Sequence, residues 1–63
     1  MADLDDIRSR LDGIAEELAD LALDALREAV QAGVKKSEQE RTLTRARSAV
    51  QKAAHLLDDV RSD

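Results

Sequence analysis

Apolar residues recur in this chain at alternating intervals of three and four positions, and this spacing constrains the fold more than any other sequence feature. In the first half, the series is Leu4, Ile7, Leu11, Ile14, Leu18, Leu21 and Ala25. In the second half, it is Leu43, Ala46, Val50, Ala53, Leu57 and Val60. An α-helix with 3.6 residues per turn places such residues on one stripe, so each series predicts an amphipathic helix. We expect the two stripes to face each other as a seam, with Ile14 opposite Leu57 and Leu21 opposite Val50.

The signals that end one helix and begin another fall between the two series. Gly33 follows the first series and suits the left-handed conformation that closes many helices, with Val34 as the apolar residue beyond it. Shortly after, residues 37–40 have the form of a capping box, in which the Ser37 hydroxyl and the Glu40 side chain each bond a free backbone N–H. The sequence therefore predicts one turn between two helices.

The fold class that follows is all-α, an antiparallel two-helix hairpin. Composition agrees, because the chain has no Pro and no aromatic residue, and 38% of its residues are charged. Asp3 is placed to cap the first helix. A short turn makes the helices antiparallel neighbours. We predict a single helical-hairpin domain over residues 1–63, with a helix over 4–32, a turn over 33–37 and a helix over 38–60.

A hairpin of this size is too small to bury all its apolar residues, since a chain of about 60 residues covers only about 60% of its unfolded surface. We expect Leu4 and Ile7 to project past the end of the shorter second helix. A second apolar edge on the first helix points to another neighbour. We therefore expect a homodimer that forms a four-helix bundle. The expected interface residues are Leu4, Ile7, Leu11, Leu23, Leu26, Val30, Leu56 and Val60.

Charge is distributed unevenly along the chain. The net charge is −4 overall, with −6 on residues 1–32 and +2 on residues 33–63. Antiparallel pairing would set the basic start of the second helix against the acidic end of the first, and would place Arg10 opposite Asp58. We interpret these charges as fixing the orientation of the helices and keeping the bundle in solution.

The charge pattern also bears on partners and on localisation. An acidic chain is repelled by nucleic-acid phosphates and by anionic membranes. A basic stripe formed by Arg41, Arg45 and Lys52 leaves weak nucleic-acid binding as an alternative function. Capture by a larger protein, with a helix in a groove, is another. No apolar run has signal-peptide or transmembrane length, so we expect a cytoplasmic protein without a membrane partner.

Residues that would carry chemistry are scarce, and we expect no catalytic residue, cofactor or metal ion. The chain has no Cys, and its one imidazole, His55, has no nucleophile placed near it by sequence. The carboxylates of Glu16, Asp20 and Asp24 share a helix face, but basic residues are expected to face them. The main prediction is a non-enzymatic module that self-associates, in the role of a small regulatory or adaptor subunit.

One segment resembles a known enzyme family. Residues 4–14, LDDIRSRLDGI, together with Leu18 and Leu21, resemble the first helix of the all-helical chorismate mutases. The resemblance implies a fragment of a helical enzyme, with Arg8 as a ligand of a dicarboxylate substrate. The sequence departs from the family at Ala25, which falls near the position of a second arginine, and a third helix has no counterpart here.

Overall fold

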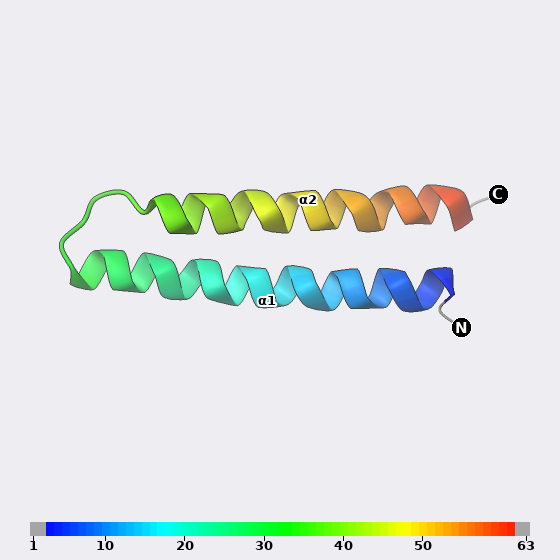
Figure 1. Ribbon diagram of the computed structural model, residues 1–63, viewed down its shortest axis with the longest axis horizontal. Coiled ribbons are helices and arrows are strands. Elements are labelled where there is room, and N and C mark those ends of the chain that lie inside the picture. The colour runs from blue at the N-terminus through cyan, green and yellow to red at the C-terminus, as the bar shows by residue number, and fades with distance from the viewer. Residues whose placement is uncertain (1–2, 62–63) are drawn as a thin grey trace.

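The computed structural model describes residues 3–61, which form two antiparallel helices packed side by side (Figure 1). Helix α1 spans Leu4–Gln31 and helix α2 spans Glu38–Arg61. The described residues contain no strand, so the predicted all-α class and the packing of two helices are confirmed. Each helix ends within one residue of its predicted end. Residues 1, 2, 62 and 63 of the predicted 1–63 domain lie outside the described part of the chain.

Side-chain caps set the start of both helices. Oδ1 of Asp3 accepts a hydrogen bond of 2.7 Å from the Asp6 N–H, and Oγ of Ser37 accepts one of 3.0 Å from the Glu40 N–H. Each bond satisfies a backbone donor that has no partner within its own helix. The second half of the predicted capping box is wrong, because Oε1 of Glu40 accepts from the Thr44 hydroxyl at 3.1 Å instead of returning to residue 37.

The end of α1 closes as the sequence predicts. Gly33 has a φ of +74°, which a residue without a Cβ adopts at little cost. Its N–H donates to the Val30 carbonyl at 3.1 Å, and the Val34 N–H donates to the Ala29 carbonyl at 2.9 Å. This pair of bonds is the Schellman motif, and it satisfies carbonyls that α1 leaves free.

The two helices end level with each other at the N-terminus of α1 and the C-terminus of α2, whereas α1 extends past α2 near the connection (Figure 1). The expectation that Leu4 and Ile7 project beyond α2 is therefore wrong, and Leu4 is half-buried. The physical reason lies in residues 32–37. The Schellman motif stops α1, and the following residues lead back along it before α2 starts, so the difference in helix length falls at the connection.

Small residues form the line of contact between the helices. The buried hydrophobic residues among those described are four alanines, Ala15, Ala22, Ala25 and Ala54. The larger residues along the contact are half-buried: Leu4, Leu11 and Leu18 on α1, and Leu43, Val50 and Leu57 on α2. Methyl side chains allow two helix backbones to approach closely, so the contact follows the alanines and the leucines flank it.

This contact line corrects the predicted seam on α1. Ile14 and Leu21 were expected to face α2, yet their exposed fractions are 43% and 52%. Each directly precedes an inward-facing alanine, Ala15 or Ala22, and neighbouring residues on a helix point about 100° apart. Because the alanines face α2, Ile14 and Leu21 are turned to the side of the hairpin.

Candidate interaction surface

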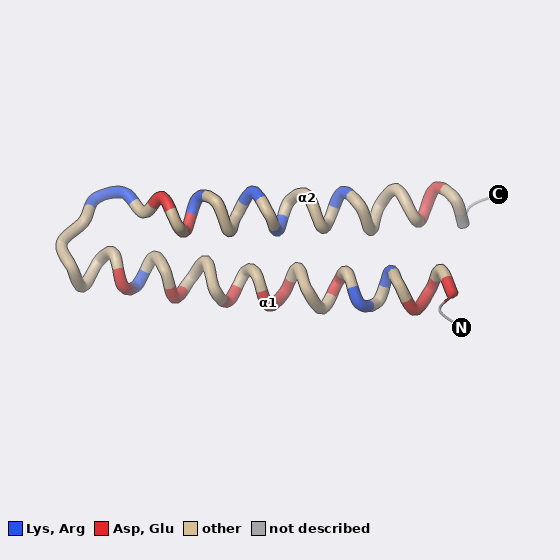
Figure 2. Tube along the Cα trace, viewed as in Figure 1, with Lys and Arg blue, Asp and Glu red and all other residues tan. Residues whose placement is uncertain are grey.

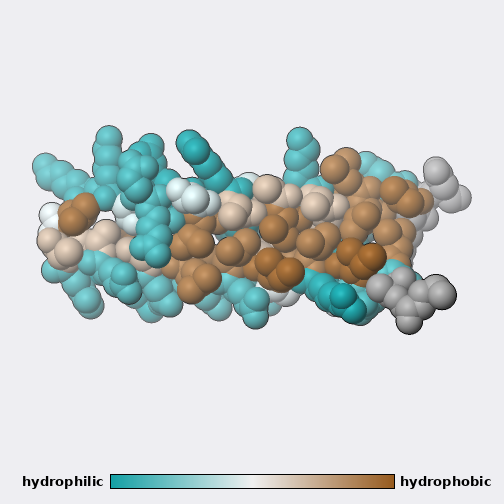
Figure 3. Space-filling view, in the orientation of Figure 1, coloured by the Kyte–Doolittle hydropathy of each residue, from teal (hydrophilic) through white to brown (hydrophobic). Residues whose placement is uncertain are grey.

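One side of the hairpin carries a surface that we call the aliphatic face, formed by Ile7, Ile14 and Leu21 of α1 and Leu56 and Val60 of α2. All five are exposed. The three α1 residues recur every seventh position, so they lie on one line along the helix. Figure 3 shows hydrophobic side chains gathered from the middle of the hairpin to the end that bears the chain termini.

The α1 and α2 residues of the aliphatic face lie on the same side of the hairpin. This follows from a groove on the opposite side, which is lined by the other flank of each helix. The groove is lined by Asp12, Ala15, Glu16, Ala19, Arg47 and Gln51. On α1, Ala19 and Ile14 flank the contact line on opposite sides; on α2, Gln51 and Leu56 do so. Since Ala19 and Gln51 share the groove, Ile14 and Leu56 share the other side.

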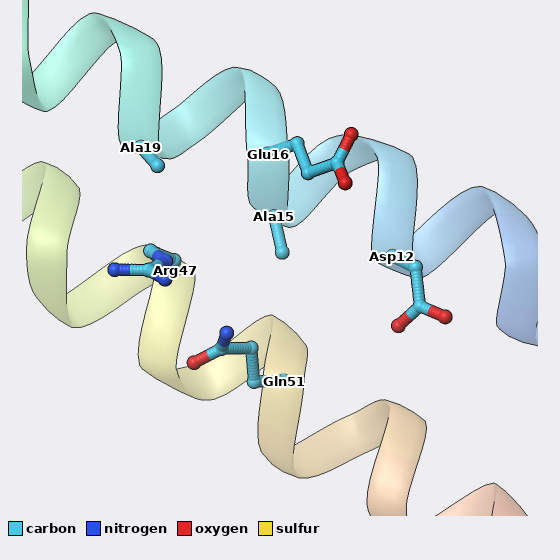
Figure 4. A pocket seen from close by; sticks show the side chains of 6 residues that line it. All are labelled: Asp12, Ala15, Glu16, Ala19, Arg47 and Gln51. Carbon is cyan, nitrogen blue, oxygen red and sulfur yellow. The ribbon is translucent and has the colours of Figure 1, made fainter.

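The groove is small and its rim is polar. Its volume is about 430 Å³. In Figure 4, the methyl groups of Ala15 and Ala19 lie between the helices, Arg47 and Gln51 come from α2, and the carboxylates of Asp12 and Glu16 lie on α1. Two acids, a base, an amide and two methyl groups at an open surface are typical of a solvated helix flank. The described residues contain no group of His, Asp or Glu side chains that could hold a metal ion.

Charged residues of both signs lie along the two helices, with acidic residues more frequent on α1 and basic residues concentrated in the first part of α2 (Figure 2). On α1, Glu17 lies three residues after Ile14 and four before Leu21. Arg10 lies three residues after Ile7 and four before Ile14, and it pairs with Asp6. On α2, Arg45 and Lys52 precede Leu56. Glu17, Arg45 and Lys52 are exposed, and none of the three forms an ion pair within the described part of the chain.

Ion pairs inside the hairpin differ from the predicted ones. Arg8, not Arg10, lies opposite Asp58, with 2.9 Å between Nε and Oδ1. Arg10 instead pairs within α1, 2.7 Å from Asp6. Two further pairs, at 3.9 Å, lie within single helices: Arg27 with Asp24, and Arg41 with Glu38. The basic half of α2 lies beside the acidic half of α1, as Arg47 and Glu16 in one groove show, but no ion pair joins these halves among the described residues.

The eight predicted interface residues fall into three groups. Leu4 and Leu11 are half-buried in the contact between α1 and α2. Ile7, Leu56 and Val60 belong to the aliphatic face. The other three, Leu23, Leu26 and Val30, are exposed. Leu26 follows Ala19 by seven positions, so it lies on the groove side of α1.

Sequence reasoning missed Ile14 and Leu21 as members of the exposed surface. A signal was present, because an alanine follows each of them directly, at positions 15 and 22. Where a repeat of small residues runs beside a repeat of large ones on a helix, a second helix can approach more closely along the small residues. The spacing of apolar residues alone does not distinguish these two contact lines.

Other residues considered from the sequence are exposed or already paired. His55 is exposed, as are Arg45 and Lys52 of the basic stripe, while Arg41 pairs with Glu38. Nucleic-acid binding by this stripe stays a prediction. Among the described residues, no helix is long and apolar enough to span a lipid bilayer.

Comparisons with protein-family models, with curated proteins and with solved structures find no significant match to the chain. The resemblance of residues 4–21 to a chorismate mutase helix therefore rests on those residues alone. In the structure, Arg8 contacts the carboxylate of Asp58 within the same chain.

Proposed function

We propose that the chain is a non-enzymatic interaction module that binds a second copy of itself through the aliphatic face, forming a four-helix bundle. The observation that carries the proposal is that the core contains only small side chains among the described residues. Among the described residues, no large side chain is fully buried, and the buried positions are alanines. The large aliphatic residues are instead exposed or half-buried, so a second surface is needed to bury them.

The area of the molecule supports the same proposal. Its solvent-accessible surface is 5093 Å². A compact folded chain of 6.9 kDa is expected to expose about 4,000 Å², so the hairpin exposes about 1,100 Å² more. A standard stable interface buries about 800 Å² on each partner. The excess surface is therefore as large as one side of a stable dimer.

The polarity of the two sides selects the aliphatic face as the dimer surface. The groove side also carries an exposed leucine, Leu26, but its Asp12, Glu16 and Arg47 would lose water on burial. The aliphatic face carries large apolar residues with charges at its borders, which is the usual arrangement of an interface core and its rim. The dimer leaves the groove side of each copy exposed, and in a regulatory or adaptor role this side would bind the further protein.

Sedimentation equilibrium of the chain at micromolar concentration tests the proposal. We expect a species of twice 6.9 kDa that dissociates on dilution. A single 6.9 kDa species across the concentration range would refute self-association.

Two matched double variants test which surface is used. Ile14→Gln with Leu21→Gln removes apolar area that is 43% and 52% exposed in the hairpin. Full burial of such a side chain stabilises by about 2 kcal/mol, so each substitution should cost about 1 kcal/mol per copy, and the double variant about 4 kcal/mol per dimer. The dissociation constant should rise by about a thousandfold.

The control is Leu23→Gln with Leu26→Gln, the same chemical change on residues that are each 46% exposed and lie off the aliphatic face. We expect less than a fivefold change in the dissociation constant. Circular dichroism confirms that both variants keep their helix. If the control weakens the dimer and the first variant does not, the surface is assigned wrongly.

A further inference from the structure

We propose that the two copies pack with their two-fold axis parallel to the helices, so that α1 of each copy lies on α2 of the other. This inference rests on the proposed self-association through the aliphatic face. The alternative axis runs across the helices and places α1 on α1 and α2 on α2. Both arrangements bring the same two faces together, and they differ in which side chains meet.

The relative height of residues on the two helices can be read from their contacts. Arg8 lies opposite Asp58, and Ala15 and Ala19 line one groove with Gln51 and Arg47. Moving along α1 by a given number of residues therefore corresponds to moving back along α2 by the same number. To within one residue, about 1.5 Å along the axis, this places Ile7 level with Val60, Ile14 with Ala53, and Leu21 with Ala46 on the aliphatic side.

An axis parallel to the helices keeps these heights and moves each residue of α1 above α2 of the other copy. Ile14 then meets Ala53 of the partner subunit, and Leu21 meets Ala46 of the partner subunit. Both alanines are half-buried and lie beside the α2 contact line. At these two heights a large residue meets a small one along both pairs of helices, so the two layers are evenly spaced there, while Ile7 meets Val60 of the partner subunit at the end of the face.

An axis across the helices matches sizes poorly. Centred on the aliphatic face, it would place Ile14 on Ile14 of the partner subunit and Ala53 on Ala53 of the partner subunit. The α1 pair would need a wide spacing and the α2 pair a narrow one, although α1 and α2 are held side by side in each hairpin. Such a mismatch leaves voids beside the alanines, and voids forfeit van der Waals contacts.

Charge favours the same arrangement. With the axis parallel to the helices, Glu17 lies along α2 of the other copy, within about one helical turn of the Arg45 and Lys52 positions of that copy. These charges have no ion pair within the described part of one chain. With the axis across the helices, Lys52 lies near the axis and therefore faces Lys52 of the partner subunit. Like charges that meet across an interface oppose association.

Single cysteines distinguish the two arrangements, because the natural chain has no Cys. Two variants are prepared separately, Ile14→Cys and Ala53→Cys, and each is oxidised alone and as an equimolar mixture. We expect disulfide-linked dimers in the mixture, several-fold above the amount in either variant alone, on a non-reducing denaturing gel. The pair Leu21→Cys and Ala46→Cys repeats the test at a second height.

A mixture of Leu26→Cys with Ala53→Cys is the control for random collision, because Leu26 lies on the groove side. Efficient linkage of Ile14→Cys to itself would overturn the proposed axis and leave self-association standing. Linkage at the control level in every sample would also overturn it if the unmodified chain sediments as a dimer. If the unmodified chain sediments as a monomer, the self-association fails, and the axis with it.

Discussion

The alanines between the helices predict a sharp contrast between two chemically identical substitutions. Ala22 is 8% exposed and lies in the contact with α2, whereas Ala19, three residues earlier on the same helix, is half-buried and lines the open groove. Replacing either by Leu adds the same carbon atoms. Leu and Ala are both strong helix formers, so the intrinsic helix propensity changes little.

The expected magnitudes differ because the added atoms meet different surroundings. At position 22 they must enter a contact built around methyl groups, and such overpacking costs about 1–3 kcal/mol. At position 19 they extend into a groove of about 430 Å³. There we expect a change within about 0.5 kcal/mol, the usual range for a surface substitution.

Thermal unfolding followed by circular dichroism at 222 nm, at one fixed chain concentration, measures the difference. For a domain of this size, 1 kcal/mol shifts the midpoint by about 4–8 °C, so Ala22→Leu should lower Tm by about 10 °C and Ala19→Leu by less than about 4 °C. Equal midpoints for the two variants, or a higher midpoint for Ala22→Leu, would show that the alanines do not set the distance between the helices.

Three further substitutions test local features of the hairpin. Ser37→Ala should lower the free energy of unfolding by about 1 kcal/mol in urea titration, because the bond to the Glu40 N–H is lost. Gly33→Ala should cost about 1–2 kcal/mol in the same assay, since a Cβ disfavours its φ of +74°; an unchanged midpoint would contradict the left-handed cap. Asp58→Asn should cost less than about 1 kcal/mol, because the Arg8 and Asp58 side chains are 37% and 35% exposed. That loss should vanish at high salt, and Asp59→Asn serves as its control.

The sequence predicts the helices well because their ends depend on local chemistry. Asp3 and Ser37 accept hydrogen bonds from N–H groups three residues later. Gly33 adopts a left-handed conformation, and the hydrogen bonds that go with it lie within five residues along the chain. None of these interactions depends on how α1 meets α2. The failed half of the capping box is also local, since Glu40 has two acceptable partners within four residues and the sequence does not rank them.

The sequence predicts that an exposed apolar surface exists, but it does not predict all the residues that form it. Ile7, Leu56 and Val60 follow from the surplus of apolar residues over what two helices can cover. Ile14 and Leu21 do not, because a wide apolar arc can turn either of its edges toward a neighbour. The choice depends on how closely two backbones approach, which is a property of both helices together.

The sequence by itself determined two helices, their caps, their antiparallel order and an excess of apolar residues, because periodicity and capping act within a few residues along the chain. The tertiary structure decided which residues face inward, which ion pair joins the helices and where their ends lie level. Close approach along Ala15, Ala22 and Ala54 turns Ile14 and Leu21 outward. The physical reason is that packing minimises the distance between backbones over the whole contact, and no single helix contains that information.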